Sequence, residues 1–346
     1  MSGADRANKN QHFFRGAARS GVTRRLVGGL AATGLLLGLA ACGGDSGGSD
    51  DGLVIGFVQV GAESAWRTAN SESVRSSAGE DDRIAELKFI DGQQDQAKQL
   101  EGMRNLITQR VDAIVLAPVV ETGWTEVLEE ARDADIPVLL ADRSVEQSDE
   151  DLYATRLGSD FVEEGRKAGA WVTEEFADAD GTAVLELEGT VGSAPANDRK
   201  AGFYEVLDGE GFDYDLLDSQ SGDFTAEGGK EVMEVFLQSH DPEDVDVLYA
   251  HNDEMGLGAI QAMEEAGVEP GEDVRVIIVD GSAAGFQAGA DGKVDYIVEC
   301  NPVFGDQLMD LAVDVVGGED VDKYVPVEES AYGPDEFADE LPNRQY

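Results

Sequence analysis

Basic residues and cysteines are scarce in this sequence. Lys and Arg together number 25 against 72 Asp and Glu, and the formal net charge is −47. A field of that sign repels nucleic acid and anionic lipid, which argues against a polyanionic partner. Only Cys42 and Cys300 occur, too few for a disulfide framework or a cysteine-based zinc site, and the three histidines lack metal-ligand spacing. We therefore expect no metal and no cofactor.

Motifs of the common enzyme classes are also missing. From residue 53 onward the sequence has no G-x-S-x-G elbow, no P-loop and no G-x-G-x-x-G after its first apolar strand. Asp142 and Asp280 could imitate the carboxylate pair of a glycosidase. Arg143 and Arg199 beside them would hold both carboxylates ionised, whereas a glycosidase needs one protonated acid. We expect a protein that is not an enzyme.

No apolar run is long enough to span a bilayer. The run at 30–41, LAATGLLLGLAA, has the length of the apolar region of a secretory signal and follows a basic, acid-poor segment. Residues 39–42, Leu-Ala-Ala-Cys, resemble a bacterial lipobox, which implies a signal peptide over 1–41 and a lipid on Cys42. Residues 42–52 would then be a lipidated flexible tether. An ordinary signal peptide with an incidental Cys42 is the alternative.

From residue 53 onward, short apolar runs alternate with amphipathic segments. This pattern is typical of repeated β-α units and a parallel sheet, so we expect an α/β fold. The expected strands are 53–60, 86–90, 113–117, 138–141, 183–187, 247–250, 276–280 and 295–298. The expected helices include 95–110, 123–134, 160–175, 225–238, 254–266 and 303–316. The units form two sets of similar size, one before about residue 155 and one after, with no linker between them.

Polar residues recur where these strands end. Since the carboxyl ends of parallel strands lie at one edge of a sheet, such residues are placed to bind a ligand together. The set comprises Trp66, Arg67, Asp142, Arg143, Arg199, Asn252 and Asp280. Carboxylates, amides and guanidinium forks bind hydroxyl groups, while the faces of Trp66 and Phe224 can cover the C–H surface of a sugar ring. Taken singly, each residue could equally form a salt bridge or a helix cap; their recurrence favours a sugar site.

Several longer stretches carry a resemblance to a known family. They are GFVQVGAESAWRTA (56–69), DGQQDQ (91–96), APVVETGW (117–124), LLADRSV (139–145), ELEGTVGSAPANDRKAGF (186–203), SQSGDFT (219–225), YAHNDEMGLGAIQAM (249–263) and VDG (279–281). The chain resembles the bacterial ribose/galactose solute-binding proteins of ABC sugar transporters, and within that group the galactofuranose-binding type.

The resemblance implies a fold and a division into lobes. The fold would be periplasmic-binding-protein-like, type I, with two Rossmann-like parallel-sheet lobes joined by three hinge strands near 153–156, 299–301 and 325. The N-terminal lobe would comprise 53–155 and 301–325, and the C-terminal lobe 156–300 and 326–346. Closure of the two lobes would bury a ligand between them.

The resemblance also implies a function and a set of binding residues. The chain would be the extracytoplasmic sugar-binding component of an ABC importer, monomeric, anchored by lipid to the outer face of the membrane, and would deliver a monosaccharide to a permease. A binding protein that presents its ligand to a membrane receptor kinase is the alternative. The ligand would contact Glu63, Ser64, Ala65, Trp66, Arg67, Asp142, Arg143, Arg199, Asn252 and Asp280, with Phe224 packing on the sugar.

Two positions depart from the family pattern. Ala226 stands where an Arg is expected after GDFT, and Cys300 lies near a hinge position at which ribose-binding relatives have Gln. Cys300 could touch the ligand or pack as a small buried thiol. A sugar-responsive transcription regulator shares the two-lobed core. Such a regulator needs a basic DNA-binding head, whereas this chain begins with what we interpret as an export signal.

Overall fold

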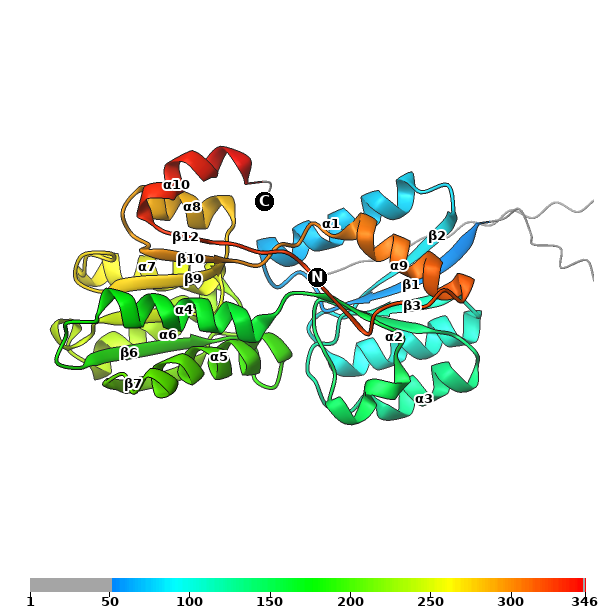
Figure 1. Cartoon of the computed structure of the whole chain (residues 1–346), viewed down its shortest axis with the longest axis horizontal. Coiled ribbons are helices and arrows are strands. Elements are labelled where there is room, and N and C mark those ends of the chain that lie inside the picture. The colour runs from blue at the N-terminus through cyan, green and yellow to red at the C-terminus, as the bar shows by residue number, and fades with distance from the viewer. Residues whose placement is uncertain (1–51, 345) are drawn as a thin grey trace, which may run out of the picture. The chain divides into compact units, whose positions relative to one another are not determined.

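The computed structural model describes residues 52–344 and 346, so the expected signal peptide, Cys42 and nearly all of the tether lie outside the described residues. Strands and helices alternate along the described chain and form two six-stranded sheets (Figure 1). The described helices include none that is both long and apolar enough to cross a membrane. The expected α/β architecture with two parallel-sheet lobes is thereby confirmed.

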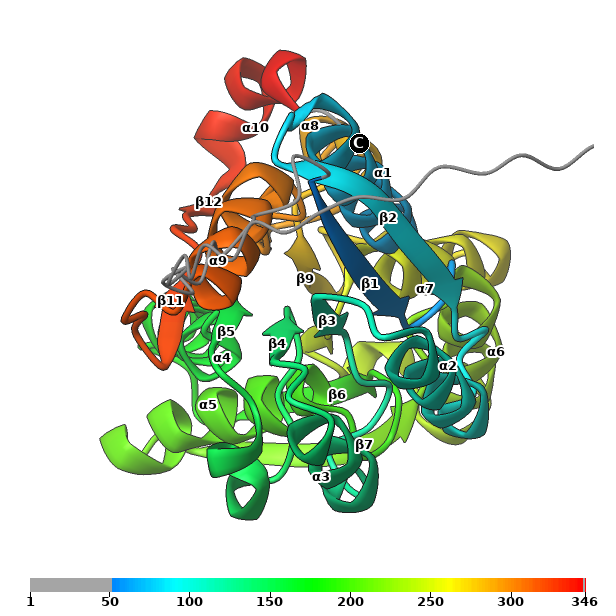
Figure 2. The same cartoon turned by 90° about the vertical axis from the view of Figure 1, so that its right-hand side faces the viewer.

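The first sheet is parallel throughout and has the strand order β11-β5-β4-β3-β1-β2 (Figure 2). Its strands are β1 Leu53–Gln59, β2 Ile84–Asp91, β3 Ala113–Leu116, β4 Val138–Ala141, β5 Arg156–Gly158 and β11 Tyr324–Pro326. The helices that pack with it are α1 Ala65–Glu80, α2 Gln96–Gln109, α3 Thr125–Asp133, α9 Gly305–Gly317 and the 3-10 helix η1 Gln147–Leu152.

The second sheet repeats this arrangement with the order β12-β10-β9-β8-β6-β7, and only β12 is antiparallel to its neighbour. Its strands are β6 Thr182–Glu188, β7 Tyr214–Ser221, β8 Val247–Ala250, β9 Arg275–Asp280, β10 Tyr296–Glu299 and β12 Ala331–Tyr332. The helices are α4 Phe161–Glu175, α5 Ala194–Glu210, α6 Ala226–Ser239, α7 Asp253–Ala266, α8 Ala283–Ala290, α10 Pro334–Glu340, and the 3-10 helices η2 Pro242–Asp244 and η3 Leu341–Asn343.

Helices cover both faces of each sheet, which explains why the inner strands are apolar without alternation. In β3, Ala113 and Val115 join the apolar cluster that includes α1 and α9, whereas Ile114 and Leu116 join the cluster that includes α2 and α3. All four side chains are fully buried. The sheets are thus rigid platforms whose carboxyl edges can hold polar side chains in fixed positions.

The described chain passes between the two sheets at three places, at 159–160 after β5, at 300–304 after β10, and at 327–330 between β11 and β12 (Figure 1). We call these segments the first, second and third crossings. The sequence placed the first lobe boundary after residue 155. The structure places β5, Arg156–Gly158, in the first sheet, where it pairs with β4 and β11.

The strands β5, β7, β11 and β12 are not among the strands expected from the sequence, and β7 is the longest of them. Its segment YDLLDSQS at 214–221 is mostly polar, and β7 lies at the edge of its sheet with its side chains half-buried or exposed. An edge strand needs less apolar surface than a central strand, so its pattern is weak in the sequence.

Candidate ligand-binding site

A small cavity lies where the carboxyl ends of strands from both sheets meet. Ligands of open α/β sheets bind at this edge. The structure brings into the cavity wall every expected binding residue except Ala65. The lining residues are Glu63, Ser64, Trp66, Arg67, Asp142, Arg143, Phe161, Pro195, Arg199, Phe224, Asn252, Asp280 and Cys300.

Ala65 lies outside the cavity wall. It is the first residue of α1, its side chain is exposed, and its backbone N–H donates to Glu254 Oε1 at 3.0 Å. Because Glu254 belongs to α7, this hydrogen bond joins the first sheet's α1 to a helix of the second sheet. Ala65 is thus a contact between lobes in the structure and not a lining residue.

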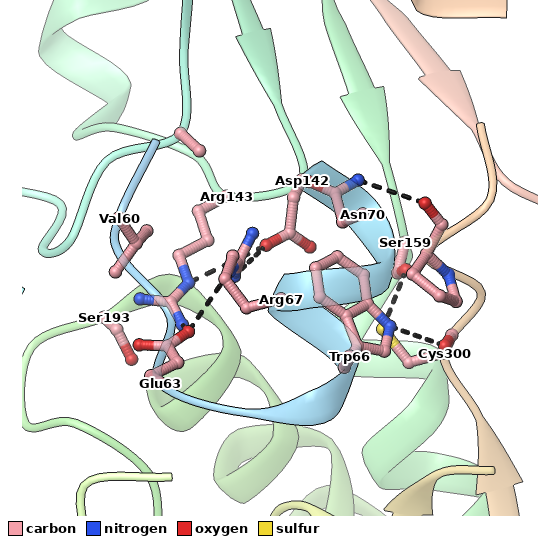
Figure 3. A network of polar contacts seen from close by, with 12 residues as sticks. Val60, Glu63, Trp66, Arg67, Asn70, Asp142, Arg143, Ser159, Ser193 and Cys300 are labelled. Carbon is pink, nitrogen blue, oxygen red and sulfur yellow. Dashed lines mark hydrogen bonds and ion pairs between the residues drawn. The ribbon is translucent and has the colours of Figure 1, made fainter. Parts of the chain in front are cut away.

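Ser64 fixes the start of α1 and thereby aims the next side chains. Its Oγ accepts the backbone N–H of Arg67 at 3.1 Å, as an N-cap residue does. The Trp66 indole N–H donates to the carbonyl oxygen of Cys300 at 2.6 Å (Figure 3). This bond ties the indole to the second crossing, while its ring forms part of the cavity wall.

Four charged side chains form a buried network on the first-sheet side of the cavity (Figure 3). Arg67 Nη2 lies 2.7 Å from Asp142 Oδ2, and Arg67 Nε lies 3.3 Å from Glu63 Oε1. Arg143 Nη2 pairs with the same Glu63 oxygen, and Arg143 Nε lies 3.7 Å from Asp142 Oδ2. Both guanidiniums share both acids, so the formal charges within the network cancel.

Burial and the two acids act in opposite directions on these guanidiniums. At Arg67, burial lowers the pKa, but Asp142 and Glu63 outweigh it, so the pKa is raised. At Arg143, burial lowers the pKa more than Glu63 raises it. Since an Arg starts from a pKa above about 12, both side chains stay charged at neutral pH. They are donors held in place before any ligand arrives.

Asp142 and Asp280 adopt backbone conformations that favour glycine. Their φ values are 67° and 117°. Strained residues of this kind persist only where the surrounding structure holds them, and they are common at ligand sites. At Asp142 the neighbouring strand packs tightly, because a Cβ at Gly158 would lie 2.4 Å from the Asp142 carbonyl oxygen. The strained backbone lies where β4 and β9 end, and there the side chains of Asp142 and Asp280 line the cavity.

Arg199 provides the guanidinium on the second-sheet side. Its Nε donates to Glu164 Oε2 at 2.6 Å, its Nη1 donates to the His251 carbonyl oxygen at 2.6 Å, and its Nη2 lies 3.8 Å from Asp280 Oδ1. Burial raises the pKa of Asp280 well above its usual range, although Arg199 opposes this rise. The expectation that the neighbouring guanidiniums keep Asp280 ionised is therefore wrong, because burial outweighs Arg199. A protonated Asp280 can donate as well as accept a hydrogen bond.

Phe224 and Asn252 complete this side of the wall. Asn252 caps α7 by accepting the N–H of Met255 at 3.0 Å, and its Nδ2 donates to the Phe224 carbonyl oxygen at 3.2 Å. The Phe224 ring occupies a slot that exists only because residue 189 is glycine: a Cβ there would lie 1.8 Å from Phe224 Cζ. From the other lobe, Arg143 Cζ lies 5.3 Å from the ring centroid, within cation–π distance.

Phe161 and Pro195 line the cavity although the sequence did not single them out. Phe161 begins α4 directly after the first crossing, and the Arg199 guanidinium carbon lies 5.2 Å from its ring centroid. Pro195 is in the first turn of α5. Their position at the start of helices that follow strands β5 and β6 is a usable signal, which a search restricted to polar residues overlooks. Cys300, noted in the sequence as a departure, also lines the cavity and is buried.

One acidic cluster lies behind the cavity. Glu164, Cys300 and Glu329 each offer a ligand atom within 4.8 Å of the others, and no other such group occurs within 52–344 and 346. Hydrogen-bond donors already occupy it: Ser159 Oγ and the Asn301 N–H donate to Glu329, and Arg199 donates to Glu164. Burial raises the pKa of the Cys300 thiol, which disfavours the thiolate that a metal would need. We assign no metal to this cluster.

Comparison with known proteins identifies the family. A family profile described as periplasmic binding protein domain matches residues 55–320. The galactofuranose-binding protein YtfQ of Escherichia coli is 41% identical over 295 residues, covering 85% of this chain and 92% of its own.

Solved structures agree with that match. A Mycobacterium smegmatis protein in complex with β-D-fucofuranose is 50% identical with a TM-score of 0.81, covering 85% of this chain and 95% of its own. The binding component of the arabinose ABC transporter of Shewanella sp. ANA-3, bound to α- and β-L-arabinofuranose, is 42% identical with a TM-score of 0.79, covering 84% and 95%. The resemblance drawn from the sequence is confirmed, and the chain belongs to the periplasmic binding protein family, with its type I fold.

Proposed function

We propose that this protein is the extracytoplasmic substrate-binding component of an ABC sugar importer. It binds a monosaccharide, in the furanose form, in the cavity between the two sheets and delivers it to a membrane permease. The observation that carries the proposal is the balance of charge at the wall: Arg67 and Arg143 share Glu63 and Asp142, and Arg199 is bonded to Glu164 behind the wall. Such a wall suits a neutral ligand rich in hydroxyl groups and disfavours a sugar phosphate.

The ring form is inferred from the relatives. The three proteins compared above are named for, or bound to, galactofuranose, fucofuranose and arabinofuranose. The cavity is small, which favours a single sugar unit over an oligosaccharide.

Each side chain of the wall has a proposed role. The guanidiniums of Arg67, Arg143 and Arg199 donate to adjacent sugar oxygens, and Asp142, Asp280 and Asn252 accept from or donate to hydroxyl groups. Trp66, Phe224 and Phe161 cover the C–H faces of the ring, and Glu63 holds two of the guanidiniums in position. These roles use groups that are fixed before binding, so little ordering is needed when the ligand arrives.

Binding is coupled to closure of the two lobes about the three crossings. In the structure the lobes already touch at the cavity rim: the Glu121 N–H donates to the Gly192 carbonyl oxygen at 2.9 Å, and Asn197 Nδ2 donates to Glu121 Oε2 at 2.6 Å. Arg143 of one lobe also lies over Phe224 of the other. Closure excludes water from the sugar and strengthens each polar contact.

We further propose that the protein is exported, that Cys42 carries a lipid anchor, and that the protein acts as a monomer on the outer face of the membrane. The support is the lipobox-like sequence at 39–42 and the polar tether that follows it. Fractionation of cells that express Cys42→Ser tests the anchor. Release of this variant from the membrane is expected, and retention contradicts the lipid anchor.

Calorimetry with the purified chain tests the sugar site. Arabinose, galactose, fucose and ribose are titrated separately, and a complex crystal or NMR spectrum establishes the ring form that is bound. Tight binding of at least one sugar in its furanose form is expected. Absence of heat with every sugar, in a protein whose melting curve shows that it is folded, contradicts the proposal.

A further inference from the structure

All three crossings meet at the side chain of Glu329. Glu329 belongs to the third crossing, and its Oε1 accepts from Ser159 Oγ in the first crossing at 2.5 Å and from the Asn301 N–H in the second at 2.9 Å. These partners lie 170 and 28 residues away in the sequence. A single carboxyl group is therefore bonded to every segment about which the lobes must turn.

A second carboxyl group lies beside it. Glu164, on α4, is 1% exposed, and its Oε2 accepts from the cavity residue Arg199 at 2.6 Å. Among the described residues its Oε1 has no hydrogen-bond partner, although it is buried. An oxygen of Glu164 lies within 4.8 Å of one of Glu329. The pair thus connects the sugar cavity, through Arg199, to the three crossings.

Two ionised carboxylates cannot stay this close in a buried site at low cost. Other charged and titratable groups surround Glu329 from α4, α5, β11 and the second crossing. They are Glu164, Lys167, Arg199, Tyr324 and Cys300. Lys167 Nζ donates to the backbone oxygen of Glu329, at 3.0 Å, and not to its carboxylate. Arg199 bonds to Glu164, so within the part of the chain that the structure describes no cation is paired with the Glu329 carboxylate.

We propose that Glu164 and Glu329 share one proton when the lobes are closed and lose it when they open, so that the hinge binds a proton together with the ligand. Opening turns the crossings relative to one another, which breaks the bonds from Ser159 and Asn301 and admits water to the pair. The part of the proposal that concerns affinity rests on the proposed sugar function; the proton on the closed hinge does not.

The direction in which pH changes sugar affinity follows from the pKa of Glu329 in the closed and open forms. In the closed structure, burial and then Glu164 raise the pKa of Glu329 to about 9. A hydrated Glu329 in the open form returns toward the ordinary pKa of about 4.3. Between these two values closure takes up a proton, so sugar affinity falls as pH rises, by up to about tenfold per pH unit, and levels off above the pKa of the closed form.

Glu329→Gln is the decisive variant. Its amide oxygen can still accept from Ser159 and Asn301, and its NH₂ can donate to Glu164, so it mimics the protonated pair at every pH. Glu328→Gln is the matched control, because Glu328 is the adjacent acid of the same crossing and is exposed. We expect the wild type and Glu328→Gln to lose at least about tenfold in sugar affinity between about pH 6 and pH 9. Glu329→Gln should bind as tightly at about pH 9 as at pH 6.

Two further measurements separate this proposal from the sugar function. Calorimetry in buffers of different ionisation enthalpy should show proton uptake on sugar binding by the wild type and none by Glu329→Gln. Small-angle scattering without ligand should show a more compact wild type at low pH than at high pH, and no such change in Glu329→Gln. If no sugar binds, this scattering difference still supports the proton site and leaves only the sugar function contradicted.

Three outcomes overturn the proposal. The first is a wild type whose affinity and scattering are the same throughout this pH range. The second is a folded Glu329→Gln protein that follows the wild-type pH dependence or has lost binding at low pH. The third is an effect of zinc chloride at about pH 8 that tightens sugar binding or makes the protein more compact in the wild type but not in Glu329→Gln. That result would make the cluster of Glu164, Cys300 and Glu329 a metal site.

Discussion

The guanidiniums of the cavity are each held by an acid before a ligand arrives. Arg67 and Arg143 share Glu63 and Asp142, and Arg199 is bonded to Glu164. Pairing keeps buried charges tolerable and fixes the direction of each donor. The same pairing means that removal of one member affects both binding and folding.

Arg143→Ala should weaken sugar binding by about 2–3 kcal/mol, because it removes a guanidinium group and leaves its hydrogen-bond partners unpaired in a closed site. It should also lower the free energy of unfolding, since Glu63 keeps only its contact with Arg67 Nε at 3.3 Å. Calorimetry and urea unfolding measure the two effects. Arg132→Ala, at a half-exposed surface Arg on α3, is the control and should change neither; unaltered affinity of Arg143→Ala contradicts its assigned role.

Gly189→Ala tests the slot for the Phe224 ring. The new Cβ would lie 1.8 Å from Phe224 Cζ, so the ring must move out of the cavity wall. Overpacking of this kind costs about 1–3 kcal/mol, and we expect sugar affinity to fall about tenfold. In the matched variant Gly209→Ala the Cβ meets no atom within 4 Å inside α5, so it should stabilise the protein slightly and leave affinity unchanged. Equal affinities of the two variants would contradict a role for the slot.

The starts of several helices converge on the cavity edge of the sheets. Ser64, Ser193, Asn252 and Ser282 cap α1, α5, α7 and α8, and each accepts a backbone N–H of its own helix. Asp253, the first residue of α7, also accepts the Ser282 N–H of the α8 cap at 2.6 Å. This bond joins two neighbouring helices behind Asp280.

Asp253→Asn should remove a pH-dependent loss of stability. Burial raises the pKa of Asp253 to about 7, against the opposing hydrogen bonds from Ser282. The stability contributed by its protonated form is full below about pH 4 and is lost as pH rises through 7. The melting temperature of Asp253→Asn, relative to wild type, should therefore increase between these values. Asp241→Asn, at an exposed acid that caps η2, is the control; a constant difference at Asp253 would disprove this reasoning.

At the scale of the whole molecule, the lobes are linked by the crossings and by contacts at the rim. Glu121 provides a rim contact through its backbone and through its carboxylate, which accepts from Asn197. Burial and the nearby Glu121 also raise the pKa of Asp198 to about 6. Closure thus brings acids of an already strongly acidic protein together at the rim.

Glu121→Ala should speed release of the bound sugar about twofold to fivefold, because it removes the exposed hydrogen bond from Asn197 to the Glu121 carboxylate, which joins the two lobes. Stopped-flow fluorescence measures the release rate, and the melting temperature without ligand should stay unchanged. Glu126→Ala is the matched control, because the Glu126 side chain is 85% exposed. An unchanged release rate in Glu121→Ala would show that the rim contact does not stabilise closure.

The local sequence pattern was sufficient to predict most of the helices and strands and the polar residues at the ends of the strands. β-branched runs such as 53–60 and 276–280 predicted buried strands, and parallel strands place their carboxyl ends at one edge, which is why Asp142, Asp280 and Asn252 meet in one wall. The edge strand β7 and the apolar lining residues Phe161 and Pro195 were missed, because partial burial and helix starts leave weak signals.

The sequence by itself determined the fold class, the acidic surface and the side chains that can bind a sugar, since these follow from composition, periodicity and residue order. Only the tertiary structure decided how these groups are paired. It placed Arg67 beside Asp142, Trp66 against the Cys300 carbonyl, and Glu329 between Ser159 and Asn301. Such contacts join residues from 28 to 234 positions apart, and the packing of two sheets, not any local pattern, sets their distance.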